Sequence, residues 1–128
     1  MTTTSYQSKM QQKVAEFHTK YALTQCGYAK FMAEDWLDRL RLIDEERAEL
    51  GAAACRDSIE EIIDSICDLL YVVLAVPVAL NIDIQPFFDE VHRSNMTKDG
   101  DMDSGKLTKG PGFVPPNLLP LLKKEGLL

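Results

Sequence analysis

Apolar residues recur at intervals of three and four along the first half of the chain, the spacing of amphipathic helices. In residues 6–23 the recurring positions are Val14, Phe17 and Tyr21, and Gly27 follows as a break. This pattern predicts a first helix over residues 6–23.

A second helix is predicted over residues 33–50, with Gly51 well placed to end it. Its apolar stripe consists of Trp36, Leu40, Ile43 and Leu50.

A third helix is predicted from Asp57 or Ser58 to Leu80. Ser58 is a suitable N-cap because Glu61 follows three residues later. Pro77 is expected to kink the last turns. Residues 69–80 are apolar on all sides, as in a buried helix, and too few to span a bilayer.

A fourth helix is predicted over residues 86–95, opened by Pro86 at its first position. Residues 97–116 are rich in Gly, Pro, Asp and Lys and form a long loop, which suggests a function. A short last helix is expected over residues 117–124. No alternation typical of strands is present, so the fold class is all-α. We expect a bundle of four to five helices in one domain over residues 1–128.

Charge changes this picture because it is uneven. The chain has a net charge of −6, which argues against nucleic acid as a partner. Residues 44–68 hold nine acids and two arginines, a net charge of −7, so the rest carries +1. Three cysteines without CxxC spacing and a start without an apolar signal segment favour a soluble, cytoplasmic protein without a membrane partner.

The acids form two clusters separated by a short Gly- and Ala-rich break. Because spacings of three and four return to one side of a helix, the second cluster shares a narrow face. The first cluster covers about 100° of its helix. The first comprises Glu45, Glu46 and Glu49; the second comprises Glu61, Asp64 and Asp68.

Two interpretations of these clusters are open. The first cluster lies almost opposite its helix's apolar stripe and is consistent with a solvated surface. The face of Asp64 and Asp68 continues into the apolar residues 69–80, so we expect it to run into the interior. Carboxylates there need a compensating cation.

Oxygen ligands alone favour Mg²⁺, with Mn²⁺ as a substitute, and disfavour zinc. A di-iron bundle requires two Glu-x-x-His pairs, and the chain offers only Asp89-x-x-His92. Mg²⁺ held by carboxylates keeps positions open for phosphate oxygens and water, which points to phosphate chemistry.

Cationic residues for the phosphates lie in or beside the long loop: Arg93, Lys98, Lys106 and Lys109. Asn95 is a further candidate, although it also suits a helix C-cap, and each lysine can equally be solvated. The loop lacks the spacing of a Walker-type phosphate loop.

The motifs Glu45-Glu46-x-x-Glu49, Glu61-x-x-Asp64 and Asp68-Leu-Leu-Tyr-Val-Val resemble those of the MazG-like all-α nucleoside triphosphate pyrophosphohydrolases. The segment FFDEVHRSNMTK…GKLTKGPGFVPP resembles the branch related to phosphoribosyl-ATP pyrophosphohydrolase, including phage members. The resemblance covers about residues 17–116.

This resemblance implies Mg²⁺-dependent hydrolysis between the α- and β-phosphates, with two or more ions per site. It implies that Glu46, Glu49, Glu61 and Asp64 are metal ligands, with Asp68 as an additional one. Glu45 or Glu46 would orient or deprotonate the attacking water. One position departs from the family, because Ser65 stands where many members have a glutamate.

The resemblance also implies a homodimer or homotetramer, with the active site between helices two and three completed by oligomerisation. The leading substrate hypothesis is a nucleoside or deoxynucleoside triphosphate such as (d)GTP. If the protein is phage-encoded, we expect it to act in the host cytoplasm. The alternatives are dUTP or dCTP, phosphoribosyl-ATP, and, in another class, a non-catalytic helical interaction module.

Overall fold

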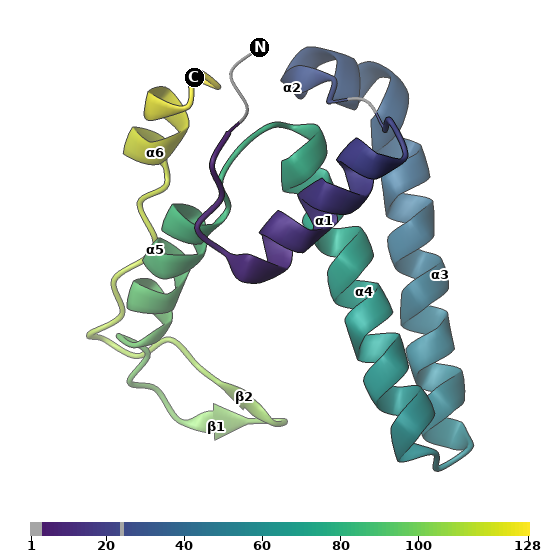
Figure 1. Cartoon of the computed structure of the whole chain (residues 1–128). Coiled ribbons are helices and arrows are strands. Elements are labelled where there is room, and N and C mark those ends of the chain that lie inside the picture. The colour runs from purple at the N-terminus through teal and green to yellow at the C-terminus, as the bar shows by residue number, and fades with distance from the viewer. Residues whose placement is uncertain (1–3, 24) are drawn as a thin grey trace. The chain divides into compact units, whose positions relative to one another are not determined.

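The computed structural model describes residues 4–23 and 25–128, and it confirms the all-α fold class (Figure 1). Contacts divide the chain into two compact units, Met1–Asp83 and Ile84–Leu128. The prediction of one domain over residues 1–128 stays a prediction. The first unit contains α1 (Lys9–Lys20), α2 (Gly27–Lys30), a π-helical turn η1 (Phe31–Asp35), α3 (Trp36–Cys55) and α4 (Ile59–Ala79).

Helix α1 packs against α4 and forms the small core of the first unit. Its first turn is capped by Ser8, whose hydroxyl accepts a hydrogen bond from the Gln11 amide at 3.2 Å. Val14 on α1 is buried against Ala75 and Val78 on α4. The helix ends at Lys20, three residues before the predicted end.

The prediction that Gly51 ends the second helix is wrong. Helix α3 continues through Gly51, which is exposed, and ends at Cys55. The chain reverses at Asp57, whose backbone φ is 51°, a left-handed conformation that ends helices. Gly51 lies inside the helix and does not adopt the positive φ of a glycine that ends one.

Helices α3 and α4 form an antiparallel pair joined by this short turn (Figure 1). Their contact includes small side chains, with Ala53 and Ser65 both buried. Ser58 caps α4 as predicted, since its hydroxyl accepts a hydrogen bond from the Glu61 amide at 3.3 Å. The capped turn fixes where the two charged helices meet.

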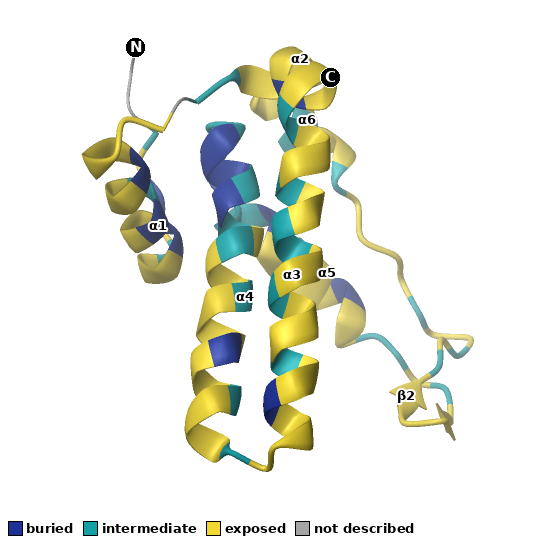
Figure 2. Cartoon of the chain, turned by 90° about the vertical axis from the view of Figure 1, so that its right-hand side faces the viewer, coloured by how far each residue is buried: buried dark blue, intermediate teal, exposed yellow. Residues whose placement is uncertain are grey.

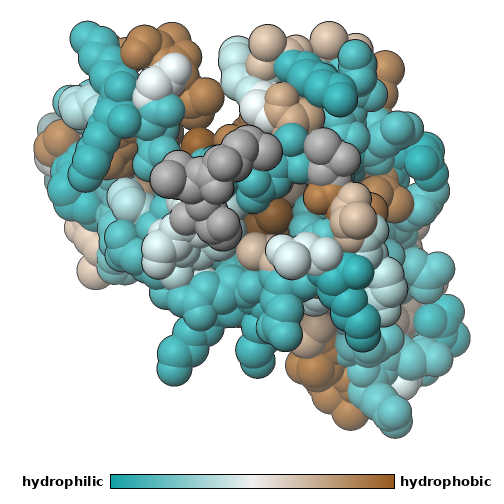
Figure 3. All heavy atoms as spheres, turned by 45° about the horizontal axis from the view of Figure 1, so that its top comes forward, coloured by the Kyte–Doolittle hydropathy of each residue, from teal (hydrophilic) through white to brown (hydrophobic). Residues whose placement is uncertain are grey.

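The apolar surface of α4 is divided differently from the prediction. Its last turn, including Pro77 and Val78, is buried within the first unit, whereas its first half is largely exposed (Figure 2). Figure 3 shows apolar side chains reaching the molecular surface between hydrophilic ones. The exposed apolar residues of α4 include Ile59, Ile63, Ile66, Leu70 and Val73.

Helix α4 is also the one helix in the described ranges that is long and apolar enough to cross a membrane, by length and composition alone. The sequence prediction counted only residues 69–80 and judged them too short. The helix carries Asp64 and Asp68 in its first half, and an aspartate at the centre of a bilayer costs about 2.5–3.5 kcal/mol.

The second unit contains α5 (Gln85–Asn95), a hairpin of β1 (Met102–Asp103) and β2 (Lys106–Leu107), and α6 (Leu119–Lys124). The all-α prediction did not include this hairpin, because two-residue strands are too short to show alternation. The hairpin turn has positive φ at both Ser104 and Gly105, which suits the twist of antiparallel strands.

Replacing Ser58 by Ala should lower the free energy of unfolding by about 1 kcal/mol, because the α4 N-terminus loses its cap. Denaturant unfolding measures this change. Ser58→Asp is the matched control, since an aspartate restores the acceptor. Equal stability of Ser58→Ala and the wild type would contradict the capping role.

Candidate active site

Carboxylates from α3 and α4 approach one another across the contact between these helices. Glu46 on α3 is half-buried, and burial raises the pKa of its carboxyl group. The nearby charges of Asp68, Glu49, Glu45 and Asp64 raise this pKa further. The two acidic clusters therefore interact within a single chain.

The two clusters differ in burial from what the sequence suggested. Glu46 was predicted to lie almost opposite the apolar stripe, yet it is half-buried and close enough to α4 to feel its charges. Asp64 and Asp68 were expected to run into the interior, but both are exposed. Between them along α4, Ser65 is the residue that is buried.

Two of the six predicted acids already have cationic partners. Glu45 accepts a hydrogen bond from Arg41 at 3.1 Å, and Glu61 accepts one from Arg56 at 2.6 Å. Both ion pairs are exposed, and each joins residues that are four or five positions apart in the sequence. Four predicted acids form no ion pair in the described part of the chain, and we call them the acid face: Glu46, Glu49, Asp64 and Asp68.

The acid face has the donor chemistry of a site for a hard divalent cation. Four carboxylates on neighbouring helices supply only oxygen ligands, and their mutual repulsion adds to the effect of burial in raising the pKa of Glu46. Within residues 4–23 and 25–128, no three His, Cys, Asp or Glu side chains are grouped closely enough to hold a metal ion. The carboxylate oxygens are thus suitable ligands for a divalent cation, but the side chains do not converge on one point in this structure.

Ser65 occupies the position where the resembling family often carries a glutamate. Ser65 is buried, with 7% of the residue exposed. The alternative ligand one turn earlier, Glu61, is held by Arg56. The charges near Glu46 therefore favour Asp64 and Asp68 as the α4 ligands.

The second unit gathers most of the predicted phosphate-binding residues in one pocket of about 650 Å³. Asn95, Lys98, Lys106 and Lys109 all line it. The three lysines form no ion pair with any residue that the structure describes. We call this the lysine pocket.

Arg93, the remaining predicted phosphate ligand, does not line the lysine pocket. It forms an ion pair with Glu90 at 2.8 Å and donates to the Pro115 carbonyl at 3.1 Å. The hydrogen bond from Arg93, with one from the Asn117 amide, lowers the pKa of Glu90 to about 2. Arg93 and Glu90 thus tie α5 to the end of the long loop.

Sequence reasoning missed the residues that hold this loop in place. Asp99 accepts a hydrogen bond from the Gly112 amide at 3.0 Å, and Thr97 accepts one from the Val114 amide at 2.8 Å. A Cβ atom on Gly110 would lie 2.3 Å from an Asp99 oxygen. The signal in the sequence was the pair of glycines in KGPG, which permits this close approach.

Three aromatic residues of the first unit, Phe17, Trp36 and Tyr71, contact other rings. Phe17 and Tyr71 contact each other edge to face, with ring centroids 5.4 Å apart, and Trp36 contacts Phe31 at 5.8 Å. Phe17, Tyr71 and Trp36 are all partly exposed. Part of each ring is therefore accessible to a ligand.

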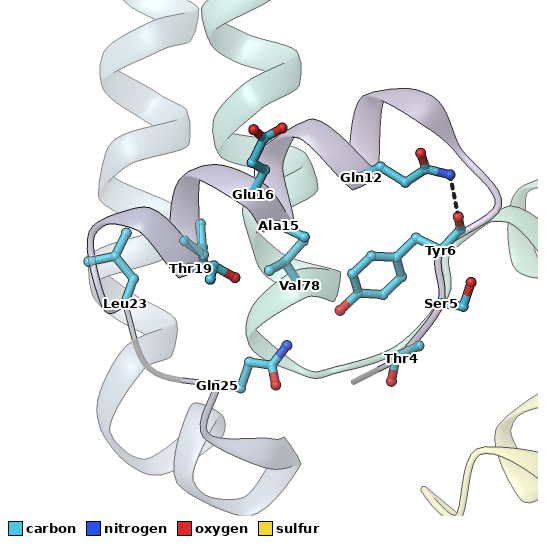
Figure 4. A pocket seen from close by; sticks show the side chains of 11 residues that line it. Thr4, Ser5, Tyr6, Gln12, Ala15, Glu16, Thr19, Leu23, Gln25 and Val78 are labelled. Carbon is cyan, nitrogen blue, oxygen red and sulfur yellow. Dashed lines mark hydrogen bonds between the residues drawn. The ribbon is translucent and has the colours of Figure 1, made fainter. Parts of the chain in front are cut away.

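A further pocket of about 490 Å³ lies between α1, the end of α4 and the N-terminal segment (Figure 4). Its lining is mainly hydroxyl, amide and apolar side chains, and Tyr6 points into it. His18 also lines it, and burial followed by the charge of Arg39 lowers the pKa of that imidazole. Because no lysine or arginine of residues 4–23 and 25–128 lines this pocket, the described lining does not suit phosphate.

The carboxylates of α3 and α4 offer oxygen ligands for a divalent cation, and the lysine pocket offers cations for phosphate groups. Residues 3–95 match the family described as phosphoribosyl-ATP pyrophosphohydrolase, and the chain belongs to this family of MazG-like all-α pyrophosphohydrolases. It is therefore a pyrophosphohydrolase of nucleoside triphosphates, a hydrolase of acid anhydrides. No match was found among curated proteins.

Replacing Glu46 by Gln should raise the melting temperature of the metal-free protein at pH 7. The pKa of Glu46 is raised above its ordinary value of 4.5 in the folded state. At pH values above 4.5 the ionised carboxylate therefore destabilises the fold. Calorimetry in EDTA measures the change. Glu60→Gln is the control, because Glu60 does not contribute to the raised pKa of Glu46. A lower melting temperature for Glu46→Gln would contradict the repulsion.

Proposed function

We propose that this protein hydrolyses a nucleoside or deoxynucleoside triphosphate to the monophosphate and pyrophosphate, using Mg²⁺ or Mn²⁺ bound at the acid face. The observation that carries the proposal is the interaction of Glu46 with Asp64 and Asp68 across α3 and α4, where none of the three forms an ion pair with a residue that the structure describes. The family match favours this enzyme over a non-catalytic interaction module.

The acid face would supply the metal ligands: Glu46, Glu49, Asp64 and Asp68. Glu61 is a ligand only after it leaves Arg56, so we place it last among the candidates. The bound cations, two or more per site, would neutralise the triphosphate and lower the pKa of a bound water.

Glu46 is the better candidate for the base that orients or deprotonates the attacking water. The charges of Asp68 and Asp64 on α4 act on its carboxyl group, whereas Glu45 is paired with Arg41. Asn95 and the lysines of the lysine pocket are the candidates to bind substrate phosphates. Arg93 keeps the loop in place through Glu90 and Pro115.

The substrate we favour is (d)GTP, on the resemblance to phage members alone. The alternatives are dUTP or dCTP and phosphoribosyl-ATP, the substrate in the family's description. The acid face and the lysine pocket recognise phosphates, which all these compounds share.

The decisive assay is pyrophosphate release from a panel of all NTPs and dNTPs with Mg²⁺ or Mn²⁺. Asp64→Asn and Asp68→Asn should each lower the rate at least about a hundredfold, because metal ions contribute several kcal/mol to such reactions. Asp44→Asn, on an exposed part of α3, is the matched control and should retain activity. Release of pyrophosphate from no nucleotide would refute the proposal.

We also propose that the chain forms a homodimer or homotetramer through the exposed half of α4. Ile59, Ile63, Ile66, Leu70 and Val73 follow one another at intervals of four and three residues, the repeat by which helices pair. Ile59 is 71% exposed and Ile63 is 53% exposed. A row of this kind on one helix is typical of an interface.

Analytical ultracentrifugation should show an oligomer for the wild type and a monomer for the double variant Ile63→Glu with Leu70→Glu. Two charges in an apolar interface cost more than the contact provides. Leu37→Glu, at a position on α3 that is 76% exposed, is the control and should leave the mass unchanged. A monomeric wild type would contradict this interface.

A further inference from the structure

Residues 44–68 contain two arginines among their nine acids, and the two arginines differ in what they contact. Arg47 is exposed on α3 and forms no ion pair with any residue that the structure describes. Arg56 lies at the end of α3, and its Nε donates to a carboxylate oxygen of Glu61 at 2.6 Å. Of these two cations, Arg56 is therefore the one that holds a predicted metal ligand.

The turn between α3 and α4 fixes the backbone of both members of this pair (Figure 1). The Arg56 amide donates to the Ala52 carbonyl at 3.1 Å, which keeps Arg56 in register with α3. The Glu61 amide donates to the Ser58 hydroxyl at 3.3 Å, within the cap that begins α4. Because hydrogen bonds hold both backbones, only side-chain torsions are ordered when the ion pair forms.

Arg56 also acts on the acidic cluster of α3. The hydrogen bond and the charge of Glu61 raise the pKa of the Arg56 guanidinium, and the charge of Glu49 raises it further. Glu49 precedes Arg56 by seven residues, which is about two helical turns, so both lie on one side of α3. One guanidinium therefore interacts with a carboxylate from each of the two helices.

Glu61 is the first residue of the acidic row on α4. Asp64 and Asp68 follow it at intervals of three and four residues and share its side of the helix. While Glu61 accepts the charge-assisted hydrogen bond from Arg56, that carboxylate oxygen is not available to a metal ion. A divalent cation at the acid face would also be repelled by the guanidinium. The affinity for the cation therefore reflects a competition with Arg56.

We propose that Arg56 is a built-in counter-ion, which holds Glu61 in the metal-free protein and is displaced when a divalent cation binds. The proposal rests on the proposed function, because it takes the acid face as the metal site. Displacement of Arg56 adds the Glu61 carboxylate to those of the acid face. Arg56 thereby sets the cation concentration at which the site fills.

Calorimetric titration of the full chain with Mn²⁺ alone measures this competition. Arg56→Gln should raise the affinity for Mn²⁺ by about fivefold, since it removes both the exposed ion pair and a repulsion of similar size. Arg47→Gln makes the same change in net charge on the same helix, without loss of an ion pair, and should raise the affinity by less than about twofold. Equal gains in the two variants, or no gain in Arg56→Gln, would overturn the proposal.

Two further variants show whether Arg56 acts through its charge and through Glu61. Arg56→Lys keeps the charge without the planar guanidinium and should bind Mn²⁺ within about twofold of the wild type. In a Glu61→Gln background, the gain from Arg56→Gln should fall to about twofold or less. A gain in Arg56→Lys as large as in Arg56→Gln, or a full gain in the Glu61→Gln background, would contradict the proposed role.

NMR spectra of the full chain observe the displacement directly, and their amide resonances confirm that each variant is folded. The Nε–H resonance of Arg56, assigned by its loss in Arg56→Gln, reports the hydrogen bond to Glu61. Saturating Mg²⁺ should move this resonance toward its position in metal-free Glu61→Gln. A resonance that does not move at saturating Mg²⁺ would show that the pair persists and would refute the displacement.

The inference about Arg56 can fail separately from the proposed function. Mn²⁺ binding of equal affinity in the wild type and Arg56→Gln, with pyrophosphate release by both, would leave the enzyme established and the counter-ion role refuted. Absence of Mn²⁺ binding from both proteins would refute the metal site and this inference together.

Discussion

The repulsion between carboxylates across α3 and α4 is the interaction on which the candidate active site depends. The short capped turn at Asp57 and Ser58 fixes the two helices in antiparallel contact, and their small buried residues allow Glu46 to come near Asp64 and Asp68. Without a cation, the repulsion within this cluster lowers the stability of the fold. Binding of a divalent cation would restore that stability.

Much of the architecture could be predicted from the sequence because it depends on local signals. Ser58 with Glu61, Pro86 at the start of α5, and the three- and four-residue apolar spacing all correspond to observed elements. Gly51 misled the prediction, since glycine ends a helix only where the chain needs a left-handed residue, and that position is Asp57. The hairpin at Ser104 was too short to leave a periodic pattern.

The candidate site could be predicted only in part, because side-chain partners are not visible in the spacing of residues. The six acids were identified, but Arg41 and Arg56 take up Glu45 and Glu61 through ion pairs. The lysines that the sequence offered do meet in one pocket, while Arg93 is occupied by Glu90. The hydrogen bonds of Asp99 to the loop depend on tertiary contacts that no local pattern reports.

The most direct test of the central claim is the position of a bound divalent ion. In amide NMR spectra of the full chain, substoichiometric Mn²⁺ broadens resonances close to the ion. The account predicts selective broadening around Glu46, Glu49, Asp64 and Asp68, abolished by Asp64→Asn together with Asp68→Asn. Broadening centred on other acids, or unchanged in that double variant, would contradict a metal site between α3 and α4.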